Sequence, residues 1–341
     1  METIASFGEF ALIARLAQGI TASAQRTDIA VGIGDDCAVL DLGSELLLLA
    51  TTDSQVEGVH FTLSTATTEQ IGRKALAVNL SDIAAMGGTP RYALVSLILP
   101  ASTSLATLDG VYAGLRQEAE CYATALVGGN IASAGTQLVI DITLLGAIER
   151  GHVLTRSGAR PGDILCVTGT LGASAGGLQT LLQPDLPYAA QALEYVRMCH
   201  CTPQPRVQEG RVLSWFGPTV VTALLDISDG LSGDLAHLCE SSNVGVRLES
   251  ATIPLSPELC SIAKCIAHDP LDWALHGGED YELLFSVAPD YVSSVIDAVQ
   301  AATGTPVTQI GTICAAHDGL MLFGLDGGVA PLRVKSWDHL R

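Results

Sequence analysis

The sequence predicts an α/β (α+β) protein with two lobes, residues 1–150 and 151–341. Short apolar runs typical of buried strands alternate with longer stretches of helical periodicity. At 341 residues the chain is longer than one hydrophobic core usually supports, so two domains are expected. A charged stretch with glycine and proline, residues 156–163, separates the two halves.

In the first half, helical periodicity predicts helices over residues 5–17, 69–86 and 105–122. A stop signal, Gly87-Gly88-Thr89-Pro90, follows the second of these. Buried strands are predicted over residues 46–50, 92–99, 125–127 and 138–148. Polar residues follow two of the strands directly: Thr51-Thr52-Asp53 after the first and Gly128-Gly129-Asn130 after the third. We therefore expect Asp53 and Asn130 at strand ends.

In the second half, strands are predicted over residues 164–167, 220–225 and 281–287, with a helix over 231–239. Residues 183–205 contain several prolines and indicate a long connection. A glycine-rich turn, residues 169–177, follows the first strand and leads into a helix. Such a turn brings backbone N–H groups close to an anion, but it is equally consistent with close packing of strand and helix.

The composition excludes several classes of protein. With 17 Lys and Arg against 36 Asp and Glu, the net charge of −19 argues against nucleic-acid binding, which needs clustered cations. None of the three lysines follows a glycine, so the classical P-loop is absent. Nine cysteines without a C-x-x-C pair favour reduced thiols. Adjacent ligands in Cys199-His200-Cys201 do not match the usual zinc spacing.

The N-terminus has no basic segment followed by an apolar one, and no apolar run approaches the ~20 residues that a membrane span needs. We therefore expect a cytoplasmic protein without a membrane partner.

Four acidic runs lie among small and apolar residues, where an unpaired carboxylate is costly to bury. They are Gly34-Asp35-Asp36, Thr51-Thr52-Asp53, Asn79-Leu80-Ser81-Asp82 and Asp226-Ile227-Ser228-Asp229-Gly230. A single acid at a strand end is usually a helix cap, but four such runs make capping alone a poor explanation. Clustered oxygen ligands without matching Lys or Arg are typical of Mg²⁺ sites that also bind phosphates. The runs therefore predict a Mg²⁺-dependent nucleotide enzyme.

Several longer motifs resemble those of the thiamine-monophosphate kinase family, in order along essentially the whole chain. They are residues 8–13 (GEFALI), 32–36 (GIGDD), 51–61 (TTDSQVEGVHF), 74–87 (KALAVNLSDIAAMG), 155–163 (TRSGARPGD), 226–231 (DISDGL), 277–283 (GGEDYEL) and 337–339 (WDH). The resemblance implies ATP-dependent phosphorylation of thiamine monophosphate to thiamine diphosphate. It also implies the fold shared with aminoimidazole ribonucleotide synthetase, in which the N-terminal sheets of two subunits form a barrel in a homodimer.

The resemblance also implies roles for individual residues. The positions that match Mg²⁺ ligands are Asp36, Thr51, Thr52, Asp53, Asp82, Asn130, Asp226 and Asp229. The positions that match ATP contacts are Gly129, Asn130, Arg156 and Ser228. His60, Glu279 and Trp337 match positions that hold thiamine monophosphate. The residues alone leave alternatives open, because His60 also suits a core imidazole and Trp337 ordinary C-terminal packing. No general base is expected, because the attacking phosphate oxygen is already anionic.

The chain departs from the family pattern at a few positions. Asn130 stands where many relatives have an aspartate, Ser133-Ala134-Gly135 lacks an arginine often found there, and Ala173 replaces a common acid. A non-catalytic binder of nucleotide or thiamine phosphate is therefore the alternative from another class. Two sister enzymes fit less well: selenophosphate synthetase needs a reactive Cys beside an N-terminal Lys, and a carbamoyl-dehydrating maturation protein needs a C-terminal Cys.

Overall fold

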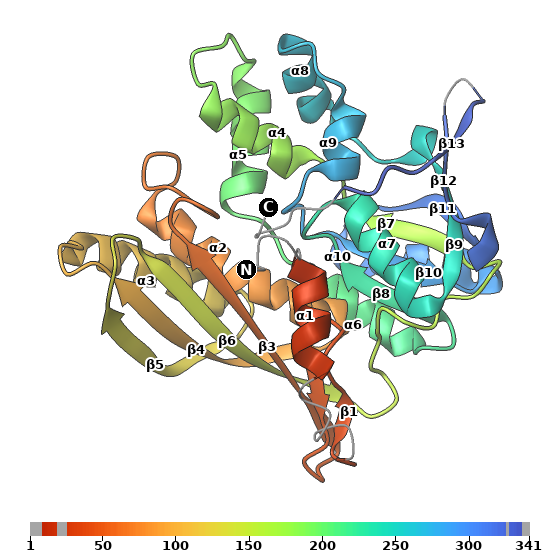
Figure 1. The fold of residues 1–341 in the computed structure, drawn as a ribbon, viewed down its shortest axis with the longest axis horizontal. Helices are drawn as coiled ribbons and strands as arrows, with labels where there is room; N and C mark the ends of the chain where they lie inside the picture. Colours follow the sequence, from red (N-terminus) through yellow and green to blue (C-terminus); the bar gives the residue numbers. More distant parts are fainter. Residues whose placement is uncertain (1–8, 19–25, 325–326, 336–341) are drawn as a thin grey trace.

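The computed structural model describes residues 9–18, 26–324 and 327–335, and its two sheets with flanking helices confirm the predicted mixed α/β class (Figure 1). The first sheet contains β1 (Ile29–Val31), β2 (Ala38–Leu40), β3 (Leu46–Val56), β4 (Thr89–Leu99), β5 (Ala125–Ser133) and β6 (Val139–Glu149). The second contains β7 (Ile164–Thr168), β8 (Val221–Asp226), β9 (Val244–Glu249), β10 (Leu283–Val287), β11 (Val307–Ala315), β12 (Leu320–Phe323) and β13 (Val329–Pro331). The predicted boundary at residue 150 falls in the connection between β6 and β7 and stays a prediction.

The helices are distributed over both halves. They are α1 (Glu9–Gln18), α2 (Thr68–Ala85), α3 (Leu105–Cys121), α4 (Ala173–Leu182), α5 (Ala190–Cys201), α6 (Val207–Phe216), α7 (Leu231–Ser242), α8 (Pro257–Cys265), α9 (Pro270–His276) and α10 (Val292–Thr303). Three short 3₁₀ turns, Ser250–Thr252, Pro289–Tyr291 and Ala316–Asp318, complete the described elements. None of the described helices is long and apolar enough to cross a bilayer.

The first sheet has the order β1-β2-β3-β6-β4-β5, with only β4 and β5 parallel. Helices α2 and α3 cover one of its faces (Figure 1). Along β3, inward residues such as Leu47 and Leu49 are buried, whereas Thr52 and Ser54 on the other face are exposed. Because side chains alternate along a strand, this pattern separates a helix-covered face from an outer face that no described helix covers.

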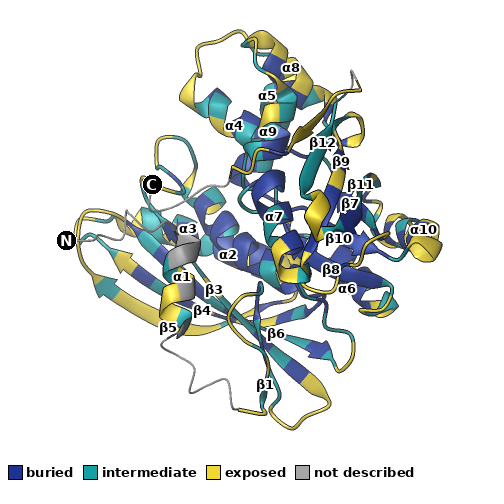
Figure 2. Ribbon diagram, turned by 45° about the vertical axis from the view of Figure 1, so that its right-hand side comes forward, coloured by how far each residue is buried: buried dark blue, intermediate teal, exposed yellow. Residues whose placement is uncertain are grey.

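The second sheet has the order β13-β12-β9-β11-β7-β10-β8. Strand β10 and the edge strand β8 are buried along their whole length, as their dark colour in Figure 2 shows. On one face Phe285 joins a core that also contains Leu49 and Leu144 of the first sheet. On the other face Leu284 packs with Leu235 of α7. One continuous core therefore connects the two halves of the chain.

Helix α2 lies at the centre of this arrangement and contacts α3, α6, β3, β6 and β8. It begins with a capping box, in which the Thr67 side chain accepts from the backbone N–H of Gln70 and the Gln70 side chain accepts from that of Thr67. Most of its side chains are buried, which is typical of a helix that is covered all round (Figure 2). The side chains of α2 are therefore held in fixed positions by the surrounding elements.

Several sequence predictions were wrong in their boundaries. Strand β3 continues through Asp53 to Val56, and β5 continues through Asn130 to Ser133, so neither residue ends a strand. The predicted connection 183–205 contains helix α5. The polar residues within β3 suggested that the strand ended early, and the prolines on either side of α5 suggested a connection without a helix. Both elements are stabilised by tertiary packing, which local sequence patterns do not contain.

Glycines let α2 and α3 approach closely, and this generates a prediction about stability. A Cβ at Gly114 of α3 would lie 1.9 Å from the carbonyl oxygen of Glu69 in α2. We expect Gly114→Ala to lower the free energy of unfolding in urea by about 1–3 kcal/mol, because the helices must separate despite the better helix propensity of alanine. Gly32→Ala is the control, since its Cβ would meet nothing closer than 3.8 Å. Equal stability of Gly114→Ala and the unchanged protein would refute the close contact.

Candidate metal and nucleotide site

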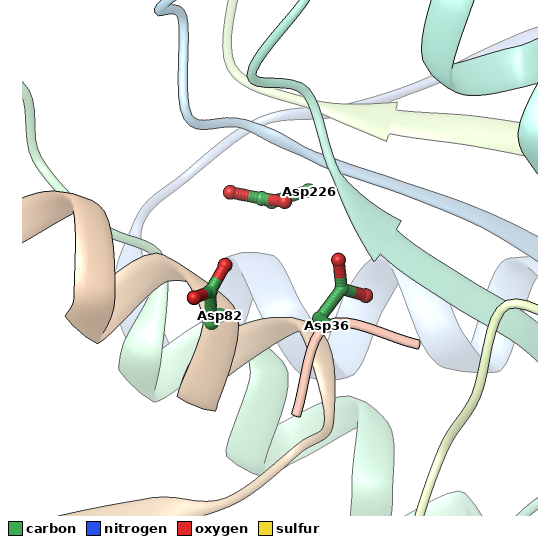
Figure 3. Close-up of side chains that lie close together, drawn as sticks. All are labelled: Asp36, Asp82 and Asp226. Carbon is green, nitrogen blue, oxygen red and sulfur yellow. The ribbon is translucent and has the colours of Figure 1, made fainter. Parts of the chain in front are cut away.

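Three aspartates from distant parts of the sequence meet at one point. Asp36 lies in the turn before β2, Asp82 on α2 and Asp226 at the end of β8 (Figure 3). One oxygen of each carboxylate lies within 4.8 Å of the others. The three acidic runs that the sequence singled out around these residues thus converge in the folded chain.

Each aspartate is positioned by its own local structure. Gly34, with φ of +121°, allows the tight turn that presents Asp36. Strand β8 is buried along its length and delivers Asp226 opposite Leu283 of β10. Gly230, with φ of +101°, then redirects the chain into α7. A buried strand followed by this turn leaves Asp226 at the edge of the core.

Hydrogen bonds from neighbouring hydroxyl and guanidinium groups orient the three carboxylates. Thr51 Oγ1 donates to Asp82, and Ser81 Oγ donates to Asp226 Oδ2 at 2.5 Å. Arg156 donates to Asp36 Oδ1 through Nη2 and, at 3.2 Å, through Nε. The second oxygen of Asp36 is buried and has no hydrogen-bond partner within the described part of the chain. That oxygen is available to a cation.

The electrostatics of the cluster also favour a cation. Burial and the neighbouring Asp36 raise the pKa of Asp226 to about 7, although Ser81 and Arg156 oppose the shift. Burial, Asp53 and Asp226 raise the pKa of Asp82 well above its ordinary value. Closely spaced buried carboxylates resist ionisation unless positive charge compensates them. The set of hard oxygen donors fits a Mg²⁺ ion.

Asp53 approaches the cluster from β3. It lies on the strand face that α2 covers, and its backbone N–H donates to Asn79 Oδ1 at 3.1 Å. Its charge contributes to the raised pKa values of Asp82 and Asp226. Asp53 is thus a neighbour of the three converging carboxylates, as the sequence-based set requires.

Asp229 lies in the turn between β8 and α7, where its backbone N–H donates to Asp234 Oδ2 at 3.1 Å. Burial, followed by the charges of Asp229 and Asp226, raises the pKa of Asp234 well above its ordinary value. Ser228, in the same turn, accepts the backbone N–H of Glu279 through its carbonyl oxygen at 2.7 Å. This turn therefore connects the carboxylate cluster to the segment that carries Glu279.

The side chains of Thr52 and Asn130 do not join the cluster within one subunit. Thr52 lies on the outer face of the first sheet, where its hydroxyl donates to the carbonyl oxygen of Ile142 at 3.1 Å. The strand pairing places Asn130 in one row with Ser96, Asp141 and Ser54, also on that outer face. Their roles as metal ligands stay predictions.

Gly129 has a packing role that does not depend on a nucleotide. It lies on the edge strand β5, and a Cβ there would fall 1.8 Å from the carbonyl oxygen of Val95 in β4. Glycine is therefore required for the close approach of the two strands. Its predicted contact with ATP stays a prediction.

Arg156 lies beside the cluster in the connection between β6 and β7. Its backbone N–H donates to Asp35 at 3.2 Å, and Asp35 also accepts the backbone N–H of Asp36 at 3.1 Å. Burial, then Asp36, raises the pKa of Asp35 to about 7. A guanidinium has five N–H donors, and two of those of Arg156 reach Asp36. The remaining donors are suited to phosphate oxygens.

Three residues are predicted to hold thiamine monophosphate, the phosphoryl acceptor, and the structure describes two of them. His60 Nδ1 accepts the backbone N–H of Val56 at 3.0 Å, which leaves its other ring nitrogen as the N–H donor when neutral. Glu279 Oε1 forms an ion pair of 2.5 Å with Lys74 Nζ, and Oε2 lies 3.4 Å from His200 Nδ1. Trp337 lies outside the described residues. The assignment of all three to the acceptor stays a prediction.

The glycine-rich turn before α4 already holds a carboxyl group of the protein itself. Asp280 accepts the backbone N–H groups of Gly172 at 2.6 Å and Ser174 at 3.3 Å. A Cβ at Gly172 would also lie 2.7 Å from the backbone nitrogen of Ala274. Burial raises the pKa of Asp280 to about 8. Close packing around the Asp280 carboxyl group therefore explains this turn better than a phosphate cradle.

Sequence reasoning assigned no role to two residues that support the cluster. Asn79 and Ser81 are fully buried on α2 and bond to Asp53 and Asp226 respectively. The available signal was their polarity, because apart from Asp82 the residues from Ala75 to Ile83 around them are apolar. Buried polar side chains need partners, so such residues are candidates for supporting roles.

Comparison with known proteins agrees with this geometry. The chain matches the models for the N-terminal domain of the AIR synthase related proteins over residues 34–148 and for their C-terminal domain over residues 160–322. It is 38% identical to thiamine-monophosphate kinase of Escherichia coli K12 over 97% of this chain and 98% of the relative. It is 36% identical to that of Bacillus subtilis over 92% of this chain and 95% of the relative.

A solved structure of AaThiL complexed with AMPPCP and TMP is similar along the whole chain. Its TM-score is 0.83 at 32% sequence identity, and the match covers 99% of each chain. The resemblance predicted from the sequence motifs is confirmed by these matches. The chain therefore belongs to the thiamine-monophosphate kinase family, within the AIR synthase related proteins.

Proposed function

We propose that the protein phosphorylates thiamine monophosphate to thiamine diphosphate with ATP, releasing ADP. The observation that carries this proposal is the convergence of Asp36, Asp82 and Asp226 from three separate elements. Family membership and the likeness to a complex with AMPPCP and TMP support the choice of substrates. The step is the last one in forming thiamine diphosphate.

Several Mg²⁺ ions would be held by the residues predicted from the sequence, with the converging carboxylates of Asp36, Asp82 and Asp226 as the central ligands. The set comprises Asp36, Thr51, Thr52, Asp53, Asp82, Asn130, Asp226 and Asp229. Bound Mg²⁺ would supply charge neutralisation for the phosphate groups. The unpartnered oxygen of Asp36 and the raised pKa of Asp226 support this assignment.

The protein's own contribution to the reaction is positioning. Arg156 would bind phosphate oxygens of ATP, together with Gly129, Asn130 and Ser228. The acceptor would lie against His60, Glu279 and Trp337. Transfer is direct and in line, because the phosphate of the acceptor is already an anionic nucleophile and phosphoryl transfer needs mainly orientation and charge compensation.

Asn130 is the main departure from the family, and we propose that it changes Mg²⁺ dependence without abolishing activity. A neutral amide oxygen can contact an ion or its water but contributes no charge. Substitution of a residue that supports the ligands of a metal typically lowers metal affinity or activity by about 10- to 100-fold. The carboxylates on the helix-covered side do not depend on Asn130 for their convergence.

We also propose that the protein is a homodimer that pairs the outer faces of its first sheets. Apolar side chains on this face include Tyr92 and Leu94 of β4, which are 52% and 40% exposed. Leu145 of β6 lies opposite Tyr92 on the same face. Exposed apolar side chains on a sheet face are typical of an interface with another chain. A barrel of two such sheets would bury this face.

The first prediction concerns turnover. The unchanged protein is expected to form ADP and thiamine diphosphate from ATP, Mg²⁺ and thiamine monophosphate, as chromatography of the products would show. Asp53→Ala and Asp226→Ala are each expected to lower kcat by more than about 100-fold, because lost metal ligands forfeit several kcal/mol of transition-state stabilisation. Both should fold, since each substitution removes a repelling charge from the cluster.

Asp109→Ala, an exposed position on α3, is the matched control and should be fully active. Near-normal rates in either cluster variant would contradict the metal assignment. Tight binding of both ligands without any product would instead favour a non-catalytic binder.

The second prediction concerns metal binding at different pH values. A folded-state pKa near 7 for Asp226, above its unfolded value near 4, means that stability contributed by the protonated form is lost as pH rises through 7. We expect Mg²⁺ to raise the Tm more at pH 8 than at pH 5.5, because the ion binds ionised ligands. Scanning fluorimetry with NaCl of equal ionic strength as control measures this, and an equal or absent shift at both pH values would oppose it.

The third prediction concerns assembly. The unchanged protein should sediment at twice its chain mass of 35.4 kDa. Leu94→Glu should shift it to monomer, because a charge in a paired apolar face is costly to bury. Leu105→Glu is the control, since Leu105 is 78% exposed at the start of α3, away from the outer face. A Leu94→Glu protein that stays dimeric would exclude this face as the interface.

A further inference from the structure

Lys74 is a buried lysine on α2, although the chain has only three lysines in all. Its side chain is 5% exposed, and its Nζ lies 2.5 Å from Glu279 Oε1. Lysine is almost never fully buried unless it is paired. The pair joins residues that are 205 positions apart, so it connects the central helix to the segment before β10.

Glu279 is held from two directions. Its backbone has φ of +67°, an unusual value for a residue other than glycine, and its N–H donates to the Ser228 carbonyl oxygen at 2.7 Å. Its carboxylate meets Lys74 on one oxygen and His200 on the other. Burial opposes ionisation, but the positive charge of Lys74 outweighs it, so the pKa of Glu279 is lowered. A strained backbone conformation and a buried cation therefore both fix the position of this one carboxylate.

Lys74 lines a small cavity next to the pair. The cavity has a volume of about 10 Å³ and is lined by residues that include Gln55, His60, Lys74 and His200. Gln55 Oε1 is buried without a hydrogen-bond partner in the described residues, and Lys74 Nζ has none there beyond its ion pair. Such a space holds about one water-sized polar group. The Lys74–Glu279 pair therefore lies beside His60, the other described residue predicted to hold the acceptor.

We propose that Lys74 is a positioning residue for the acceptor, acting through Glu279. This inference rests on the proposed function, in which Glu279 and His60 hold thiamine monophosphate. Lys74 and Asp82 are eight residues apart on α2, a rise of about 12 Å. An extended acceptor would reach from the carboxylate cluster, where its phosphate reacts, towards the Lys74–Glu279 pair. Lys74 keeps the Glu279 carboxylate ionised and fixed at that end.

The test is Lys74→Met, which removes the charge and retains most of the side-chain volume. We expect the KM for thiamine monophosphate to rise about 10- to 100-fold, the factor for loss of a hydrogen bond to a charged group. The KM for ATP should stay within about twofold, because the Arg156 region is unchanged. Calorimetric binding of thiamine monophosphate without ATP should weaken by the same factor.

Arg73→Met is the matched control. Arg73 is the adjacent residue on α2 and pairs with the buried Glu118 of α3 at 2.8 Å, away from the acceptor. Its loss should lower the Tm without changing either KM. A rise in the KM for thiamine monophosphate in Arg73→Met equal to that in Lys74→Met would show that helix destabilisation alone is responsible, and would overturn the proposal.

A double variant separates an indirect role from a direct one. Lys74→Met/Glu279→Gln removes both charges and avoids an unpaired, partly buried carboxylate, so it is expected to fold even where the single lysine variant does not. Because Lys74 acts through Glu279, the double variant should have the same KM for thiamine monophosphate as Glu279→Gln alone. Multiplied effects, or an unchanged KM in Lys74→Met, would overturn the inference. An unchanged protein that forms no thiamine diphosphate would instead refute the proposed function.

Discussion

The structure depends on the forced proximity of like-charged carboxylates at the meeting point of two sheets. Asp36, Asp82 and Asp226 come from a turn, a helix and a strand, and burial raises the pKa values of Asp82 and Asp226. Arg156 and the hydroxyls of Thr51 and Ser81 offset part of this cost. A fold that only needed stability would gain from apolar residues here. This cost supports the proposal that divalent cations bind the cluster and compensate its charge.

In the proposed function, helix α2 supports both the carboxylate cluster and the residues that would hold thiamine monophosphate. It carries Asp82 and Ser81 near its C-terminus, Asn79 beneath β3, and Lys74 two turns earlier. Glycine contacts with α3 and packing against α6 and β8 hold the helix on all sides. Because phosphoryl transfer depends on alignment of donor and acceptor, a buried helix is a suitable common support. Small shifts of α2 would displace both ends of the substrate pair together.

Much of the fold could be predicted from local patterns, and the site only in part. The apolar runs at 92–99 and 138–148 and the periodicity over 69–86 gave elements close to β4, β6 and α2, since each is buried on at least one face. The acidic runs identified the converging carboxylates because unpaired acids among apolar residues are rare. Pairing across the sheet, which places Thr52 and Asn130 on the outer face, depends on registers that no local pattern contains. The Lys74–Glu279 pair and the occupation of the glycine-rich turn by Asp280 likewise arise from contacts between distant segments.

The most direct test of the central claim is a crystal structure of the protein with AMPPCP and Mn²⁺ in place of Mg²⁺, with data collected at the manganese absorption edge. Manganese prefers similar oxygen ligands and its anomalous signal locates the ion independently of the protein coordinates. We expect anomalous peaks between the carboxylates of Asp36, Asp82 and Asp226, adjacent to the phosphates of the analogue. Bound nucleotide without any anomalous peak within coordination distance of these three residues would contradict the assignment of the cluster as the metal centre.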